Sequence, residues 1–138
     1  MKRSNSLVIC GQLHYGSCCL LEVSCDAGDS NIPARFAIGA AIPSERNDGG
    51  VDGYHCWAEF YADGKWWPVD ISEADKYTSL ATYYFGHHPA NRLEFSRGRD
   101  LVVEPGPTSG PINFLAYPIL EIDGKPVKAE VVFSFERS

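Results

Sequence analysis

The feature that most constrains the fold is a pair of strand-like runs around one turn signal. Residues 54–61 and 65–71 are rich in aromatic and β-branched residues, and the dipeptide Asp63-Gly64 lies between them. Such runs favour extended backbone, and an Asp-Gly pair readily adopts the positive φ angles of a tight hairpin turn. The sequence therefore predicts an antiparallel β-hairpin over residues 54–71.

The length of the turn decides which side chains of the hairpin share a face. With a two-residue loop, Ala62 lies opposite Lys65. The same register then places Trp57 opposite Asp70, and because side chains alternate along a strand, His55 shares a face with Asp70. A three-residue loop with a bulge would turn one of these side chains to the other face. The two-residue loop thus predicts an imidazole next to a carboxylate.

A histidine beside an aspartate has a known catalytic use. A carboxylate on one ring nitrogen orients the imidazole and stabilises its charged form, while the other nitrogen takes a proton from a nucleophile. The alternative is structural: His55 is an exposed strand residue, and Asp70 caps the helix that follows the hairpin. Spacing alone leaves both interpretations open.

The rest of the chain predicts a mixture of strands and short helices. We expect a helix over residues 73–85 that begins at Ser72, with Asp75 completing a capping-box-like start, and that ends at Gly86. Residues 44–53 are expected to be a loop and residues 104–111 and 123–126 turns. A short helix is suggested at residues 18–23. Strands are expected at residues 34–42, 101–103, 112–120 and 127–135.

Length and composition exclude several classes of protein. A chain of 138 residues that is 44% hydrophobic has enough apolar surface for one packed domain. The net charge is −6 and no basic run exceeds Lys2-Arg3, so no nucleic-acid partner is expected. No apolar stretch approaches the roughly 18 residues that cross a bilayer, and no signal-peptide core is present, so we expect a cytoplasmic protein without a membrane partner. The odd number of cysteines, without C-x-x-C spacing, favours reduced thiols.

Several segments resemble the transglutaminase-like superfamily. Residues 53–61 (GYHCWAEFY) and 67–70 (WPVD) resemble that family's His and Asp motifs, and residues 31–35 (NIPAR) are similar to its Gly-Ile-Pro-Ala-Arg segment. Likeness to bacterial members continues through four further segments, residues 70–74, 84–86, 91–92 and 96–100. The resemblance covers roughly residues 31–126 and implies one α+β domain over residues 1–138. It also implies a papain-like core, in which a Cys-bearing helix packs on an antiparallel sheet that carries His55 and Asp70.

The family's nucleophile is the cysteine of a Gly-x-Cys tripeptide at the start of a helix. Residues 16–18 supply this tripeptide. Its cysteine is slightly closer to Pro33 along the chain than in the family, and a polar turn cluster lies between the two residues. We therefore expect Cys18 to be the nucleophile and Cys19 to be the second candidate. The alternative is that both are buried as small hydrophobic residues. A further hypothesis is that the first 30 residues come from a shifted reading frame or an atypical start, which would remove the nucleophile.

The resemblance implies acyl transfer through a Cys-His-Asp triad. The Cys18 thiolate attacks a peptide or carboxamide carbonyl, and His55 protonates the leaving amine. Attack by water on the resulting thioester gives a hydrolase or peptidase, whereas attack by a lysine amine gives a crosslink. A peptide or protein partner is expected, and no cofactor or metal. The alternative is a catalytically inactive domain of the same fold that binds peptides.

Two other groups of side chains suggest different functions. Trp66-Trp67 suggests a carbohydrate-binding platform, although strand aromatics more often belong to the core. His87-His88 together with His14 suggests a metal site, although adjacent histidines after a helix-ending glycine are more often solvated.

Overall fold

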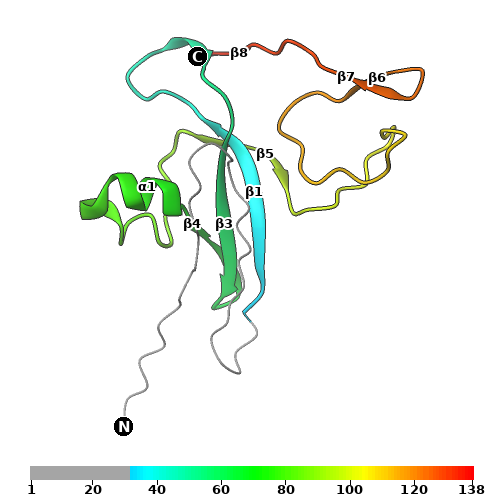
Figure 1. Ribbon diagram of the computed structural model, residues 1–138. Coiled ribbons are helices and arrows are strands. Elements are labelled where there is room, and N and C mark those ends of the chain that lie inside the picture. Colours follow the sequence, from blue (N-terminus) through cyan, green and yellow to red (C-terminus); the bar gives the residue numbers. More distant parts are fainter. Residues whose placement is uncertain (1–31) are drawn as a thin grey trace. The chain divides into compact units, whose positions relative to one another are not determined.

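The structure, a computed structural model, describes residues 32–138. These residues form mostly β-strands with one short α-helix (Figure 1). The chain divides into two compact units. The described part of the first unit comprises residues 32–36 and 56–88, and the second unit comprises residues 37–55 and 89–138.

The first unit contains the predicted hairpin. Strands β3 (His55–Ala62) and β4 (Lys65–Val69) are antiparallel, with Ala62 opposite Lys65. Asp63 and Gly64 have φ angles of 51° and 80°, so both adopt the left-handed conformation that a two-residue hairpin turn requires. The start of strand β1 (Ala34–Ala41) adjoins β3 in this unit, because the Tyr61 N–H donates to the carbonyl of Pro33 over 2.8 Å. The predicted hairpin and its two-residue loop are confirmed.

The segment after the hairpin is less helical than expected. Helix α1 covers only Ile71–Lys76, and a 3₁₀ helix, η1, covers Thr78–Leu80. The backbone then returns to β4, where Val69 and Phe85 form an isolated bridge and the Gly86 N–H donates to the carbonyl of Pro68 over 2.7 Å. The expectation of a helix over residues 73–85 is wrong, because pairing with the edge of β4 requires extended backbone there and overrides local helix propensity.

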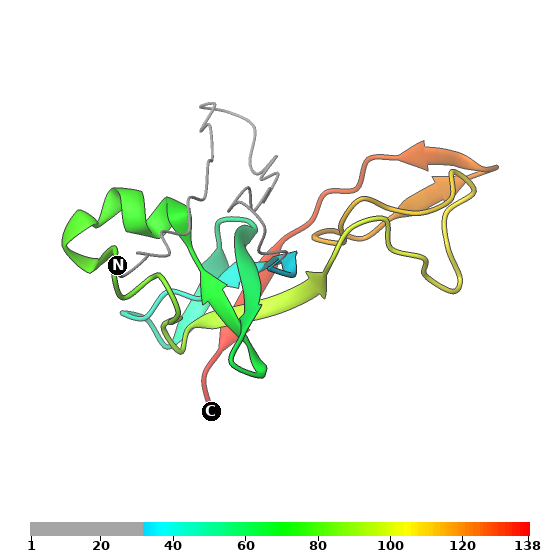
Figure 2. The ribbon, with the colours of Figure 1, turned by 90° about the horizontal axis from the view of Figure 1, so that it is seen from below.

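The second unit contains three antiparallel pairings. The rest of β1 pairs with β5 (Arg92–Arg97), and the register shifts between Ile38 and Gly39. Strand β2 (Asp48–Val51) pairs with β8 (Phe133–Glu136). Strands β6 (Leu120–Ile122) and β7 (Lys125–Val127) form the orange hairpin in Figure 2. The β1–β5 pair belongs to a sheet with the strand order β4-β3-β1-β5, whereas β2–β8 and β6–β7 are separate two-stranded sheets.

Several strand predictions need correction in the second unit. Residues 101–103 and 112–120 were expected to be strands, but only an isolated bridge joins Leu101 and Ile112, and β6 begins at Leu120. The expected loop at residues 44–53 contains β2, and β5 was not predicted. Of the strand expected at residues 127–135, only Val127, the last residue of β7, and residues 133–135, the start of β8, are in strands. Within residues 32–138, no helix has the length and apolar character needed to cross a bilayer.

Each unit buries its own part of β1 in an apolar core. In the first unit the core residues are Phe36, Cys56, Trp57, Ala58, Val69 and Tyr84. In the second unit they are Ala37, Ile38, Ala40 and Ala116. Because Asp70 is the one charged residue among the buried side chains of residues 32–138, it is the residue whose burial most needs a reason.

The β6–β7 hairpin is tied to the preceding loop through Glu121. The hydroxyl and the N–H of Thr108 both donate to Glu121 Oε2, over 2.7 and 2.9 Å, and they lower the pKa of Glu121 from its ordinary value of 4.5. Because the pKa is lowered in the folded state, the contact stabilises the fold above the ordinary pKa and is lost as the pH falls through the lowered one.

We expect the substitution Thr108→Val to raise the pKa of Glu121 back toward 4.5, because it removes the hydroxyl that is the largest cause of the shift. A carboxyl-carbon NMR titration of both proteins measures this change. An identical titration of Glu121 in the two proteins would show that Thr108 does not hold the carboxylate in solution.

Candidate active site

Asp70 lies between β4 and α1 and is completely buried, with an exposed fraction of 0%. Its Oδ1 accepts hydrogen bonds from Ser72 Oγ over 2.9 Å and from the Glu73 N–H over 3.1 Å. Its own N–H donates to the carbonyl of Tyr84 over 3.0 Å. These bonds make Asp70 the N-cap of α1, in place of the expected Ser72, and they repay part of the cost of burying a carboxylate.

His55 is the first residue of β3 and is half-buried. The observed pairs of β3 and β4 run from Ala62 opposite Lys65 to Ala58 opposite Val69. One further step in this register assigns Trp57 to Asp70, as predicted, and strand alternation puts His55 on the same face of β3 as Trp57. The register of the observed pairs, from Ala62 opposite Lys65 to Ala58 opposite Val69, is the predicted one. The pairing of His55 with Asp70 stays a prediction.

The expected nucleophile, Cys18, and the second candidate, Cys19, lie outside the described residues. Cys56 is buried, with 7% of its surface exposed, and is disulfide-bonded. The expectation of reduced thiols is therefore wrong for Cys56. Because Cys56 directly follows His55 along β3, alternation directs their side chains to opposite faces.

Both tryptophans of β4 contact other side chains or backbone groups of the first unit. The guanidinium of Arg35 lies 3.8 Å from the ring centroid of Trp66, and its Nε bonds Glu59 Oε2 over 2.6 Å. The Trp67 Nε1–H donates to the carbonyl of Ala62 over 3.1 Å, and Lys65 Nζ lies 3.6 Å from the Trp67 ring centroid. A cation thus covers one face of each ring, which favours hairpin packing over a carbohydrate platform.

The contact between Arg35 and Glu59 was not predicted. Arg35 belongs to the segment that resembles the family's Ile-Pro-Ala-Arg sequence, and Glu59 lies in the predicted hairpin. The opposite charges of these two strand-forming segments are a signal for such a contact, but the sequence alone does not show that the two segments pair. The ion pair is partly buried and fastens the start of β1 to β3 within the first unit.

The two adjacent histidines contact aromatic rings. His87 stacks on Tyr83, with ring centroids 5.4 Å apart, and His88 lies edge-on to Trp57 at 4.9 Å. Over residues 32–138, no group of three or more His, Cys, Asp or Glu residues is arranged to hold a metal ion. His14, the third member of the hypothetical metal site, lies outside this range.

Comparison with known proteins shows a family match over the segment that contains His55 and Asp70. Residues 29–71 match the family model of the transglutaminase-like superfamily. An uncharacterized protein of Haemophilus influenzae is 37% identical over 91 residues, a match that covers 56% of this chain but only 25% of the relative. No solved structure matches the chain. The stretch that matches the transglutaminase-like superfamily thus contains the Ile-Pro-Ala-Arg segment, the hairpin, His55 and Asp70, in agreement with the resemblance of the sequence motifs.

Proposed function

We propose that this chain is a cysteine acyltransferase or hydrolase that acts on peptide or carboxamide bonds through Cys18, His55 and Asp70. The observation that carries the proposal is the superfamily match over residues 29–71, which contains both His55 and Asp70. The hairpin register and the buried, hydrogen-bonded carboxylate of Asp70 support it. In this proposal a helix that begins at Cys18 packs on the sheet to give a papain-like core in one domain.

The proposed reaction passes through a thioester. His55 takes the thiol proton of Cys18, and the sulfur attacks the carbonyl carbon while a backbone N–H at the nucleophile stabilises the oxyanion. The carbon–nitrogen bond then breaks, and His55 returns the proton to the departing amine. Water or a second amine attacks the thioester and restores the thiol. No step needs a cofactor.

Asp70 has two roles in this proposal, one for each carboxylate oxygen. Both bonds that come from the start of α1 end on Oδ1. They hold the carboxylate in one orientation, and we assign Oδ2 to a ring N–H of His55. Such a bond would fix the tautomer of the imidazole and stabilise the imidazolium that forms when Cys18 loses its proton. The hydrogen bonds at the start of α1 thereby orient the carboxylate that positions His55.

The reactivity of the thiols tests the proposal. The protein is reduced and treated with limiting iodoacetamide near neutral pH, and peptide mapping by mass spectrometry measures the alkylation rate of each cysteine. We expect Cys18 to react at least about 10-fold faster than the other cysteines, because a neighbouring imidazolium stabilises its thiolate. His55→Ala should remove this preference.

The matched control is His87→Ala, because His87 is exposed and contacts Tyr83. This variant should label as the unaltered protein does. Equal and slow labelling of all cysteines in the unaltered protein would contradict the proposal and would favour the inactive, peptide-binding alternative.

A further inference from the structure

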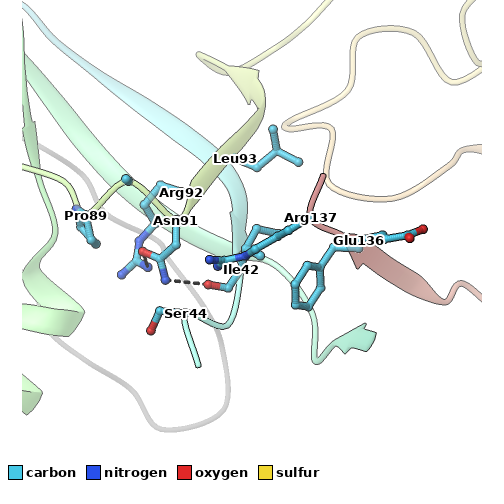
Figure 3. Close-up of a pocket in the computed structure, with 10 residues that line it drawn as sticks. Ile42, Ser44, Pro89, Asn91, Arg92, Leu93, Glu136 and Arg137 are labelled. Atoms are coloured by element: carbon cyan, nitrogen blue, oxygen red, sulfur yellow. Dashed lines mark hydrogen bonds between the residues drawn. The ribbon is translucent and has the colours of Figure 1, made fainter. Parts of the chain in front are cut away.

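The second unit contains a pocket of about 540 Å³ that the proposed catalysis does not use. It lies among the residues that follow β1, the start of β5 and the end of β8 (Figure 3). Its volume is within the range of small-molecule and peptide side-chain pockets. We infer that this pocket binds a peptide segment through a carboxylate and an adjacent apolar side chain.

The pocket has an apolar part to its lining. Ile42, Leu93 and Phe135 contribute to it, and 53% of the Leu93 surface is exposed. An exposed leucine gains free energy when an apolar group covers it. Because only a few apolar side chains line the pocket, it suits one apolar side chain of a ligand rather than a long acyl chain.

Two arginines, Arg92 and Arg137, line the same pocket. The acidic lining residue, Glu136, has its carboxylate directed away from the guanidinium of Arg137 in Figure 3. Arg137 Nη2 donates to the carbonyl of Pro43 over 2.8 Å, and that acceptor is neutral. Arg137 thus brings a positive charge to the pocket, although the whole chain has a net charge of −6.

A third guanidinium lies near the same aromatic ring. Arg46 and Arg137 each have their guanidinium carbon 5.9 Å from the ring centroid of Phe135. Arg46 Nη2 donates to the carbonyl of Gly50 over 2.8 Å, again a neutral acceptor. Among residues 32–138, neither Arg46 nor Arg137 has a carboxylate within ion-pair distance. Their positive charge is thus available to an anionic ligand.

The backbone around the pocket is held in place before any ligand binds. The Ile42 N–H donates to the carbonyl of Asn91 over 2.8 Å, and Asn91 Nδ2 donates to the carbonyl of Ile42 over 2.6 Å. The Arg137 N–H donates to the carbonyl of Asn47 over 2.8 Å. A preformed pocket loses less conformational entropy on binding.

The chemistry of the lining selects the ligand. A planar guanidinium bonds both oxygens of a carboxylate, and the apolar part of the lining favours a hydrophobic group beside that carboxylate. A peptide offers this combination in two ways, as a C-terminal carboxylate on an apolar residue or as a Glu side chain next to an apolar residue. The pocket is a binding site independent of the proposed thiol chemistry.

Four fluorescein-labelled hexapeptides test the inference by fluorescence anisotropy. Two end in leucine, one as the free acid and one as the amide. Two have amidated ends and an internal Glu-Leu or Gln-Leu pair. We expect at least one acid to bind about 10-fold more tightly than its neutral partner, an effect of the size that a charge-assisted hydrogen bond gives. Which acid binds identifies the source of the carboxylate.

Two variants assign the binding to the pocket. Arg137→Ala alters an exposed side chain and should weaken binding of the acid about 10-fold. Lys128→Ala removes an equal charge from an exposed residue outside the pocket and should change nothing. The side-chain amide NMR signals of Asn91 should shift on titration with the acid.

Equal binding of each acid and its neutral partner would overturn the inference. So would binding that is unchanged in Arg137→Ala, or Asn91 signals that do not move. His55→Ala should bind the peptides as the unaltered protein does. An unaltered protein that shows no thiol preference but still discriminates between the peptides would contradict the proposed function alone. One that shows the thiol preference but does not discriminate between the peptides would contradict this inference alone.

Discussion

In the substitution Asp70→Asn we expect the alkylation of Cys18 to slow about 10-fold, to the rate of the other cysteines, because its thiolate loses the stabilising imidazolium of His55. An amide keeps an oxygen that can accept the two bonds from Ser72 and Glu73, so the cap of α1 is retained. A neutral amide cannot stabilise the imidazolium of His55, and its NH₂ group favours the wrong tautomer. Peptide mapping after limiting iodoacetamide measures the rate.

Two further variants separate this effect from helix capping. Asp70→Ala also removes the cap, so it should lower the free energy of unfolding by about 1 kcal/mol or more relative to Asp70→Asn in urea denaturation. Asp75→Asn makes the same charge change at an exposed position of α1 and should leave the alkylation rate unchanged. If Asp70→Asn labels as the unaltered protein does, Asp70 is a helix cap alone.

The largest expected loss of stability comes from Gly39→Ala. Gly39 lies at the register shift between β1 and β5, and a Cβ added there would clash with the carbonyl oxygen of Leu93 and lie 2.8 Å from the Cα of Glu94. Both contacts are with backbone, so the two strands would have to separate. We expect the free energy of unfolding to fall by about 3 kcal/mol, the upper end of the usual cost of overpacking. Urea denaturation measures the change.

Gly50→Ala is the matched control for the same unit. Gly50 lies in β2, and a Cβ added there would come no closer than 3.8 Å to the carbonyl oxygen of Phe133. Its effect should be within about 0.5 kcal/mol, as for most surface substitutions. A Gly39→Ala protein as stable as Gly50→Ala would show that β1 and β5 do not approach so closely at this point.

The hairpin could be predicted because its information is local. Asp63-Gly64 has the backbone freedom of a two-residue turn, and the flanking runs have strong β-propensity. Once the loop length is known, the register follows, and the observed pairs confirm it. The match to the transglutaminase-like superfamily contains this same segment. Local turn chemistry and family resemblance therefore agree on the part of the chain that carries His55 and Asp70.

The other elements depend on contacts between distant residues. Strand β2 contains two glycines and has low β-propensity, and it forms through pairing with β8 near the end of the chain. The segment after α1 is extended at Phe85 because it pairs with Val69. Strand β5 is an exception, because Leu93 and Phe95 alternate with polar residues, a pattern that is typical of a half-buried strand.

The candidate site could be predicted from the sequence only in part. The capping role that was one interpretation of Asp70 is observed, through its bonds with Ser72 and Glu73. This role is compatible with catalysis, because it uses one of the two carboxylate oxygens. The disulfide at Cys56 was not predicted, since counting cysteines does not specify their pairing. The assignments of Cys18 as nucleophile and His55 as its base stay predictions.

A crystal structure of the reduced, full-length chain tests the central claim most directly, through two distances. One joins Cys18 Sγ to the nearer imidazole nitrogen of His55, and the other joins the second imidazole nitrogen to the carboxylate of Asp70. We predict both to be about 4 Å or less, as in substrate-free catalytic sites. Sulfur atoms of Cys18 and Cys19 that both lie more than about 10 Å from the imidazole would contradict the assignment, because no hydrogen bond or single water spans that distance.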